Sequence, residues 1–514
     1  MAKSKINSIG VPTAIFKQQH EDAVPCLDLM GGTEAMRAAA ERYIMQKEAE
    51  SKRNYFARIN RTVLRNVFSQ TIGYYCGQVF SRDVALDNIS SPIDDKQLQQ
   101  FKDWAEDVNQ RGKNITAWSS DAFASGLISG VTFCLVDYPK IYTEVQDGVT
   151  LYRSADGEMR VKNAAADESE GWKPYFVHIP AEQVLDCRAE WENGRQKITH
   201  FRYFEIVYEA ENETSFDVVG VKYIHAYWPG RWELWRVLNG KDDANLQKVS
   251  EGTMALDEIP LAVYMPGTPK SEFTARPALM DLAWLNIWHW QATSEQNDLL
   301  AYVRLPVWLV TGAEQKYDKN GNPMPIPFGP GNVIFLGQGG TVQSIGVNPS
   351  SVEAGRQDLK DIEDAMTAYG LQNLNNSTGY FSQMTAAQVN QRTRESNSQL
   401  KNWALSYKDF LENCLRFVAK WWGLEDGPSV QVNDVYANSA SIDYVLQLYD
   451  KAIISKETLT DFAVRLGVLP DDFNYQDEVA KLARDTTNTA NAGQNFNMSL
   501  AARLGLTGSQ NIQE

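Results

Sequence analysis

The feature that most constrains this chain is a long amphipathic segment near its C-terminal end. It follows Thr385, a residue type that often caps a helix start, and runs to about 422. In its second half, apolar residues recur every three or four positions, the spacing of a packed helix face. They are Leu400, Trp403, Tyr407, Leu411, Cys414, Val418 and Trp421. The sequence therefore predicts one helix of roughly 37 residues, about 55 Å long.

The first half of this predicted helix, over 386–399, is almost wholly polar. A helix in an ordinary globular core would not expose polar side chains on every side for four turns. We therefore expect this half to face a solvent-filled cavity or another subunit.

The composition is that of a soluble globular protein. Of 514 residues, 43% are hydrophobic and 22% are charged, which excludes a disordered or collagen-like chain. The net charge of −16 argues against tight DNA binding over a broad surface, because such binding depends on basic residues. The five cysteines are widely spaced with no CxxC, which argues against a zinc site and a disulfide framework. Without a signal peptide or a long apolar run, we expect synthesis in the cytosol.

Known catalytic motifs are absent from the sequence. It contains no P-loop, HExxH, GxSxG or EF-hand pattern. The glycine-rich stretch 329–340 has no lysine and opens onto β-type residues, so it predicts a β-hairpin rather than a phosphate loop. The five histidines show no ligand spacing. An acid/base pair among the carboxylates stays open, because a sequence alone cannot pair them.

Short β-type runs dominate the chain between 131 and 264. Turn residues separate them, which favours a mixed or antiparallel β domain. The preceding segments 27–83 and 96–128 have the composition and period of helices. The chain is therefore predicted to be an α+β protein.

A β-structured insert is predicted between two later helices. The first helix begins near Pro277 and leads into strand-like residues at 305–312. Four closely spaced prolines deny the next loop a helix, and strand-like residues return at 333–337. The second helix spans 352–370, and an uncharged stretch at 371–384 separates it from the long helix.

This order of elements resembles that of the portal proteins of tailed bacteriophages. Local sequence resembles one branch, the uncharacterised portal-like family of phage head proteins. The matching segments extend through nearly the whole chain: they are 29–44, 124–139, 281–312, 359–370 and 454–474. The chain departs from the family pattern at Phe133 and Cys134 and in its Asn-rich tail.

The resemblance implies a portal fold with a mixed α/β wing, a two-helix stem, a β-structured clip, a channel loop, a long wing helix and a helical crown. The resemblance implies a wing over 1–270, with its β-rich part at 131–264. The first stem helix would span 271–303, the clip 304–346 and the second stem helix 352–370. The channel loop would follow at 371–385, then the long wing helix at 386–423, the crown at 424–485 and a loosely ordered tail at 486–514.

The resemblance also implies a function that is structural and not enzymatic. Twelve copies would form a ring at one capsid vertex of the virion, through which the terminase packages double-stranded DNA and through which the DNA later leaves. Partners would be the terminase large subunit, the major capsid and scaffolding proteins, and a tail or neck adaptor, with no cofactor, metal or membrane. Two alternatives stay open: another phage head structural or adaptor protein, and an enzyme with an acid/base pair in the β-rich part.

Both implied stem helices are acidic. Residues 271–300 carry four acidic side chains and one basic, and 352–370 carry five and two. Repeated around a ring, they would form an acidic channel that repels phosphate within about a Debye length. The acids of the second helix are Glu353, Asp358, Asp361, Glu363 and Asp364. The alternative is that they are ordinary solvated helix faces.

Basic residues outnumber acidic ones in the long helix. At its polar start, Arg392 and Arg394 are candidates for transient contact with DNA phosphates, or for salt bridges between subunits. On the first stem helix, Trp284 and Trp288 lie four residues apart and are expected at a subunit interface, or packed within their own subunit.

The predicted channel loop carries no charge, so it can pass a phosphate backbone without binding it tightly. Its candidate residues are Asn375, Asn376, Ser377, Thr378, Tyr380 and Phe381. The alternative is an ordinary surface turn with the two aromatic side chains packed on the following helix.

Overall fold

A computed structural model describes most of the chain. The described residues are 9–88, 91–139, 143–146, 149–153, 158–161, 170–210, 216–238, 246–304, 307–313, 317–323, 336–345, 349–370, 386–432, 446, 449–451, 454–465, 469, 473, 475–479 and 481. The chain divides into two compact units, Met1–Asn433 and Asp434–Glu514. The prediction of an α+β protein is confirmed.

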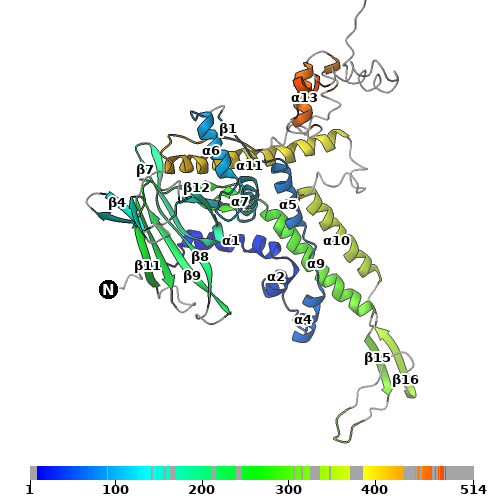
Figure 1. Ribbon diagram of the computed structural model, residues 1–514. Helices are drawn as coiled ribbons and strands as arrows, with labels where there is room; N and C mark the ends of the chain where they lie inside the picture. Colours follow the sequence, from blue (N-terminus) through cyan, green and yellow to red (C-terminus); the bar gives the residue numbers. More distant parts are fainter. Residues whose placement is uncertain are drawn as a thin grey trace, which may run out of the picture. The chain divides into compact units, whose positions relative to one another are not determined.

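Helices make up the N-terminal part of the first unit (Figure 1). They are α1 (Ala14–Met30), α2 (Gly32–Ala38), α3 (Ala40–Tyr43), α4 (Lys52–Arg61), α5 (Val67–Val79), α6 (Asp95–Ala105) and α7 (Ile115–Ser129). The helical prediction from residue 27 onward started too late. Pro25 lies inside α1 and is unfavourable in a helix interior, which hides this helix in the sequence.

Local signals define the ends of α6 and α7. Asp94 forms a capping box with Gln97 at the start of α6, and the Asn114 side chain caps α7. Gly130 ends α7 with φ of 84°, a left-handed conformation that favours glycine. A Cβ atom there would lie 2.8 Å from the carbonyl oxygen of Ala275, so the close approach of these two segments requires glycine.

The strand pairings in the described part of the β-rich region are antiparallel. One sheet has the order β11-β10-β9-β8-β7, a second has β12-β2-β6, and a third has β3-β4-β5. The strands are β2 (Thr132–Asp137), β3 (Thr143–Gln146), β4 (Val149–Arg153), β5 (Met159–Val161), β6 (Tyr175–Pro180), β7 (Val184–Glu192), β8 (Arg195–Ala210), β9 (Val218–Trp228), β10 (Arg231–Val237), β11 (Leu246–Thr253) and β12 (Leu261–Tyr264).

A hydrophobic core joins the first two sheets. It contains Phe133 and Leu135 of β2, Phe201 of β8 and Tyr227 of β9, and Phe16 of α1 packs into the same cluster. This core holds the N-terminal helices on the β-rich part.

A helical hairpin follows, with a strand pair between its two helices. Its parts are α9 (Met280–Arg304), β15 (Val307–Ala313), β16 (Leu336–Ile345) and α10 (Pro349–Gly370). The first stem helix was predicted from 271, which is wrong at its start. Residues 275–276 form β14, paired with β13 (Thr268–Pro269), because Pro277 keeps the residue before it extended.

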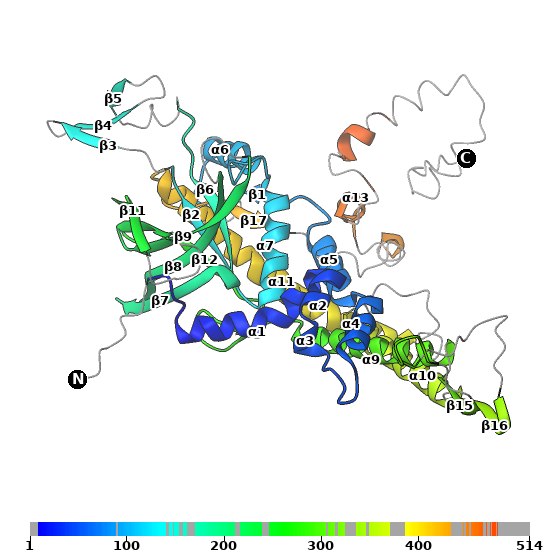
Figure 2. The same cartoon turned by 90° about the horizontal axis from the view of Figure 1, so that it is seen from below.

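The predicted long helix is present as α11 (Ala386–Trp421) and runs along the β12-β2-β6 sheet (Figure 2). The predicted stripe packs inward: Leu400, Trp403, Tyr407, Leu411, Cys414 and Val418 are buried. Trp421 is half-buried and donates a hydrogen bond from Nε1 to the Val136 carbonyl at 2.9 Å. The side chains of 386–398 lie outside the described residues, so the role of the polar half stays a prediction.

The crown was predicted from 424 onward. Residues 429–431 form β17 (Ser429–Gln431), which pairs with β1 (Ala85–Asp87) inside the first unit. The second unit begins at Asp434. It contains α13 (Lys456–Arg465). Ser455 caps the start of this helix, because its Oγ accepts a hydrogen bond from the backbone N–H of Thr458 at 3.1 Å. The predicted tail at 486–514 lies outside the described residues.

Candidate functional site

The candidate site is built around α9, which neighbouring helices hold by side-chain contacts. Asn286 bridges to α5 by accepting from the Phe68 N–H at 2.9 Å and donating to the Arg65 carbonyl at 2.9 Å. Arg58 of α4 donates to Ser294 Oγ at 3.2 Å. These buried hydrogen bonds fix which sides of α9 face the protein and which remain open.

A buried ion pair supports the α4 side of this arrangement. Arg58 and Glu50 are joined by two hydrogen bonds, the shorter 2.7 Å, and their side chains are only 2% and 8% exposed. The Arg58 guanidinium lowers the pKa of the Glu50 carboxyl by hydrogen bonding, so the pair is charged at neutral pH. Removing one partner would leave an uncompensated buried charge.

The five predicted stem acids all lie on α10 but have different surroundings. Glu353, Asp358 and Asp361 are exposed, whereas Glu363 and Asp364 are half-buried. Glu363 forms an ion pair with Arg65 and lies 3.3 Å from His289 Nε2, so this carboxylate is engaged within the subunit. Glu353, Asp361 and Asp364 lie on the side of α10 away from its buried residues Ile362 and Met366, and Asp358 lies at the edge of that side.

Trp284 and Trp288 lie on an open stripe of α9. Their exposed fractions are 50% and 51%, whereas Trp290 on the same helix is fully buried. Trp284 meets Tyr43 edge-on, with 6.5 Å between the ring centroids. About half of each indole therefore stays uncovered within one copy of the chain, an arrangement that suits contact with another protein surface.

The remaining predicted site residues cannot be placed with their side chains. Asn375, Asn376, Ser377, Thr378, Tyr380 and Phe381 lie outside the described residues. Arg392 and Arg394 belong to the backbone of α11, but their side chains also lie outside the described part. Their roles stay predictions.

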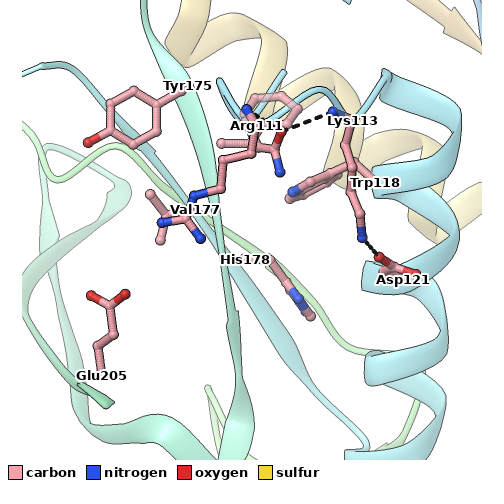
Figure 3. A pocket seen from close by; sticks show the side chains of 10 residues that line it. Arg111, Lys113, Trp118, Asp121, Tyr175, Val177, His178 and Glu205 are labelled. Carbon is pink, nitrogen blue, oxygen red and sulfur yellow. Dashed lines mark hydrogen bonds and ion pairs between the residues drawn. The ribbon is translucent and has the colours of Figure 1, made fainter. Parts of the chain in front are cut away.

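A pocket of about 230 Å³ opens beside β6 in the β-rich part (Figure 3). Its lining includes Arg111, Tyr175 and Glu205, together with an ion pair between Lys113 and Asp121. The loop that carries Arg111 is held by Asp107, whose Oδ1 accepts from the backbone N–H of Arg111 at 3.0 Å. A pocket of this kind is where an acid/base pair of the alternative enzyme hypothesis would lie.

The histidine of this pocket is hydrogen-bonded to a neutral partner. His178 Nε2 lies 2.9 Å from Thr132 Oγ1, and burial lowers the His178 pKa to about 4. A catalytic base is usually oriented by a carboxylate and has a pKa nearer the working pH. The contacts of His178 are therefore those of a neutral, buried structural side chain.

Within the described ranges, His, Cys, Asp and Glu side chains form no group of three that could hold a metal ion. In the same part of the chain, no helix is long and apolar enough to cross a membrane. All five cysteines are described, buried and free of disulfides, and burial raises the pKa of Cys26 and Cys76 to about 12.

The sequence reasoning missed two site residues, Arg65 and His289. Both contact Glu363 and thereby join α10 to α9 and to the start of α5. The available signal was weak: His289 is a single titratable residue between Trp288 and Trp290 in an otherwise apolar run. A histidine in such a run requires a polar partner when the helix is buried.

One family model matches part of this chain. Residues 278–422 match the family model described as "Domain of unknown function (DUF4055)", which covers α9 through α11 and under a third of the chain. No curated protein matches this chain.

Some solved structures are distantly similar. A chain of the "Neck of empty GTA particle computed with C6 symmetry" has a TM-score of 0.40 and 12% identity, with 78% of this chain and 90% of that chain covered. A chain of the "Neck of native GTA particle computed with C12 symmetry" has a TM-score of 0.38 and 12% identity, with 84% and 98% covered. A chain of the "Virion of native gene transfer agent (GTA) particle" has a TM-score of 0.38 and 11% identity, with 78% and 89% covered.

Proposed function

We propose that this protein is a portal subunit of a phage-like particle, a structural component without enzymatic activity. The observation that carries the proposal is the order of the described elements. A helix pair, α9 and α10, is separated by the β15–β16 strand pair, and the uncharged segment 371–385 then leads into the long helix α11. This is the order that the resemblance to portal proteins implies for stem, clip, channel loop and wing helix.

The open aromatic stripe on α9 supports assembly into a ring. Trp284 and Trp288 are each about half exposed, and large exposed aromatic side chains are typical of interface centres. In the proposed ring, copies of the chain cover these side chains. Twelve copies are proposed, as in the family that the sequence resembles.

The proposed ring is a conduit for double-stranded DNA. The uncharged segment 371–385 lines the narrowest part, where a phosphate backbone must pass without binding tightly. Arg392 and Arg394 contact phosphates transiently. The acids of α10 were assigned to the channel wall from the sequence, and that assignment depends on which way α10 faces in the ring.

The proposed location is the portal vertex of the virion. There the ring contacts the major capsid and scaffolding proteins, the terminase large subunit during packaging, and a tail or neck adaptor afterwards. No cofactor or metal is required by this function.

Imaging of the purified full-length chain tests the proposal. Negative-stain electron microscopy combined with native mass spectrometry should show rings with a central hole and a mass near twelve copies. A compact monomer at every concentration and salt condition tested would overturn the proposal. So would turnover of a small-molecule substrate that depends on residues lining the β6 pocket.

A further inference from the structure

Two helices pack on opposite sides of α9. Arg61 of α4 approaches Asp298, with 3.8 Å between Nη2 and Oδ1. Gln296 of α9 donates from Nε2 to the Val352 carbonyl of α10 at 3.0 Å. Positions two apart on a helix are rotated by about 200°, so Gln296 and Asp298 project in nearly opposite directions. Figure 1 shows the same arrangement, with α9 between α4 and α10.

The outer face of α4 is basic and partly aromatic. The helix contains no acidic residue, and the exposed Lys52 and Arg53 lie on its side away from α9. Lys52 and Arg53 form no ion pair with any residue in the described part of the chain. Phe56 lies among them with 55% of its surface exposed. We call Lys52, Arg53 and Phe56 the basic face.

The outer face of α10 carries more acidic than basic side chains, and its basic members are the exposed Arg356 and Lys360. Its acidic members are Glu353, Asp361 and Asp364, on the side away from the buried Ile362 and Met366, and the exposed Asp358 at the edge of that side. Among the described residues, Asp358 and Asp364 have no cationic partner, and Asp361 accepts only from Gln357 Nε2 at 2.7 Å. We call these four carboxylates the acidic face.

These two faces have the properties of a head-to-tail interface. A closed ring of identical copies brings two different surfaces of the chain together at every contact. The basic and acidic faces are opposite in charge and point away from each other across α9, so one copy can offer its basic face to one neighbour and its acidic face to the other. Complementary charge of this kind steers association and fixes its register.

We infer that the basic face of one copy docks on the acidic face of the next. The inference rests on the proposed ring and names the surfaces that build it. Its partner is therefore a second copy of this chain. It also changes the role of the α10 acids: they hold the neighbouring subunit, rather than lining an open channel wall.

Charge reversal tests the inference in the full-length chain. One variant carries Lys52→Glu and Arg53→Glu, a second carries Asp358→Lys and Asp361→Lys, and a third combines all four. Native mass spectrometry and light scattering at low salt would measure the ring fraction. Each pair alone should raise the protein concentration needed for rings by at least about tenfold, because like charges then face each other. The four-residue variant should restore rings.

A matched control separates this effect from a general change of charge. Lys96→Glu with Lys102→Glu alters the exposed side of α6 by the same number of charges and should leave the rings intact. Urea unfolding of every variant shows whether the fold survives. If a reversal pair unfolds, Lys52→Gln and Asp358→Asn provide milder versions that should each reduce the ring fraction.

The outcomes distinguish the two proposals. A wild-type chain that never forms rings defeats the portal assignment. If the wild type forms rings and either reversal pair still forms them equally well, the docking of the basic face on the acidic face is wrong. The same holds if the four-residue variant is folded but stays monomeric. Neither result contradicts the ring itself. Intact rings of the acidic-face variant with impaired DNA packaging would return these carboxylates to the channel wall.

Discussion

His289 on α9 and Glu363 on α10 meet across the helical hairpin, with 3.3 Å between His289 Nε2 and Glu363 Oε1. Glu363 also forms an ion pair with Arg65, which lies just before α5. Burial lowers the pKa of His289, so its imidazole is neutral at pH 7. One carboxylate therefore ties three segments together, and the position of α10 against α9 depends on it.

Replacing Glu363 with Gln should weaken this junction. The change removes the charge that pairs with Arg65 while keeping the size of the side chain. We expect the free energy of unfolding to fall by about 1–2 kcal/mol, the usual effect of losing a charged hydrogen-bond partner. Urea denaturation followed by circular dichroism measures it. Glu353→Gln is the control, because this exposed acid has only an ion pair of 3.9 Å with Arg356 and should change stability by less than about 0.5 kcal/mol. Equal effects at both positions would contradict the proposed junction.

The stability of the first unit should depend on the protonation of His178. Burial lowers the pKa of this histidine to about 4, against 6.5 for the free side chain. Between these two values the unfolded chain binds a proton that the folded chain does not, so stability falls as the pH drops from about 6.5 towards 4. The full loss would be up to about 3 kcal/mol.

A variant isolates this contribution from that of the carboxylates. His178→Gln cannot titrate in this range, whereas the carboxylates affect both proteins alike. Urea midpoints measured from pH 7.5 to 4.5 should therefore fall more steeply for the wild type than for the variant. Parallel profiles would show that His178 is not held neutral by the fold.

Elements with a strong period could be predicted from the sequence. The stripe from Leu400 to Val418 repeats every three or four residues, and the structure buries it against the sheet. The strands around Phe133 and Phe201 are rich in apolar and aromatic residues and were also predicted. By contrast, the sequence signal for β7 is weak, because the segment Val184–Glu192 contains several charged residues, including the buried Asp186.

Contacts between distant segments could not be predicted. Gln431 and Asp87 are hydrogen-bonded although 344 residues separate them, and the pairing of β17 with β1 holds residues 429–431 in the first unit. The same limit applies to Glu363, whose partners Arg65 and His289 come from other helices. Periodicity reports which side of an element is buried, but it carries no information on which distant side chain lies opposite.

Deleting 375–380 tests the proposed channel loop. The segment carries no charge and is rich in small polar residues, and it lies between α10 and α11 in the chain. We expect the shortened protein to assemble as the wild type does, while particles that carry it package or retain less DNA. Electron microscopy and measurement of packaged DNA provide the two readings. A replacement of the same six residues by Gly and Ser is the control for length. Full packaging by the shortened protein would contradict a role in the channel.

Replacing Trp284 and Trp288 together with Ala should disrupt assembly and leave the fold nearly intact. Each indole is about half exposed in one copy, so the variant loses little packing within the subunit but removes the aromatic surface offered to a neighbour. Size-exclusion chromatography with light scattering should show monomers or irregular oligomers. The free energy of unfolding of the monomer, measured in urea, should change by under about 2 kcal/mol.

Trp290→Ala is the matched control on the same helix. Its side chain is fully buried, so its loss should lower the free energy of unfolding by about 3–5 kcal/mol. If the double variant instead forms intact rings and loses as much stability as Trp290→Ala, the two indoles pack within their own subunit and belong to its core.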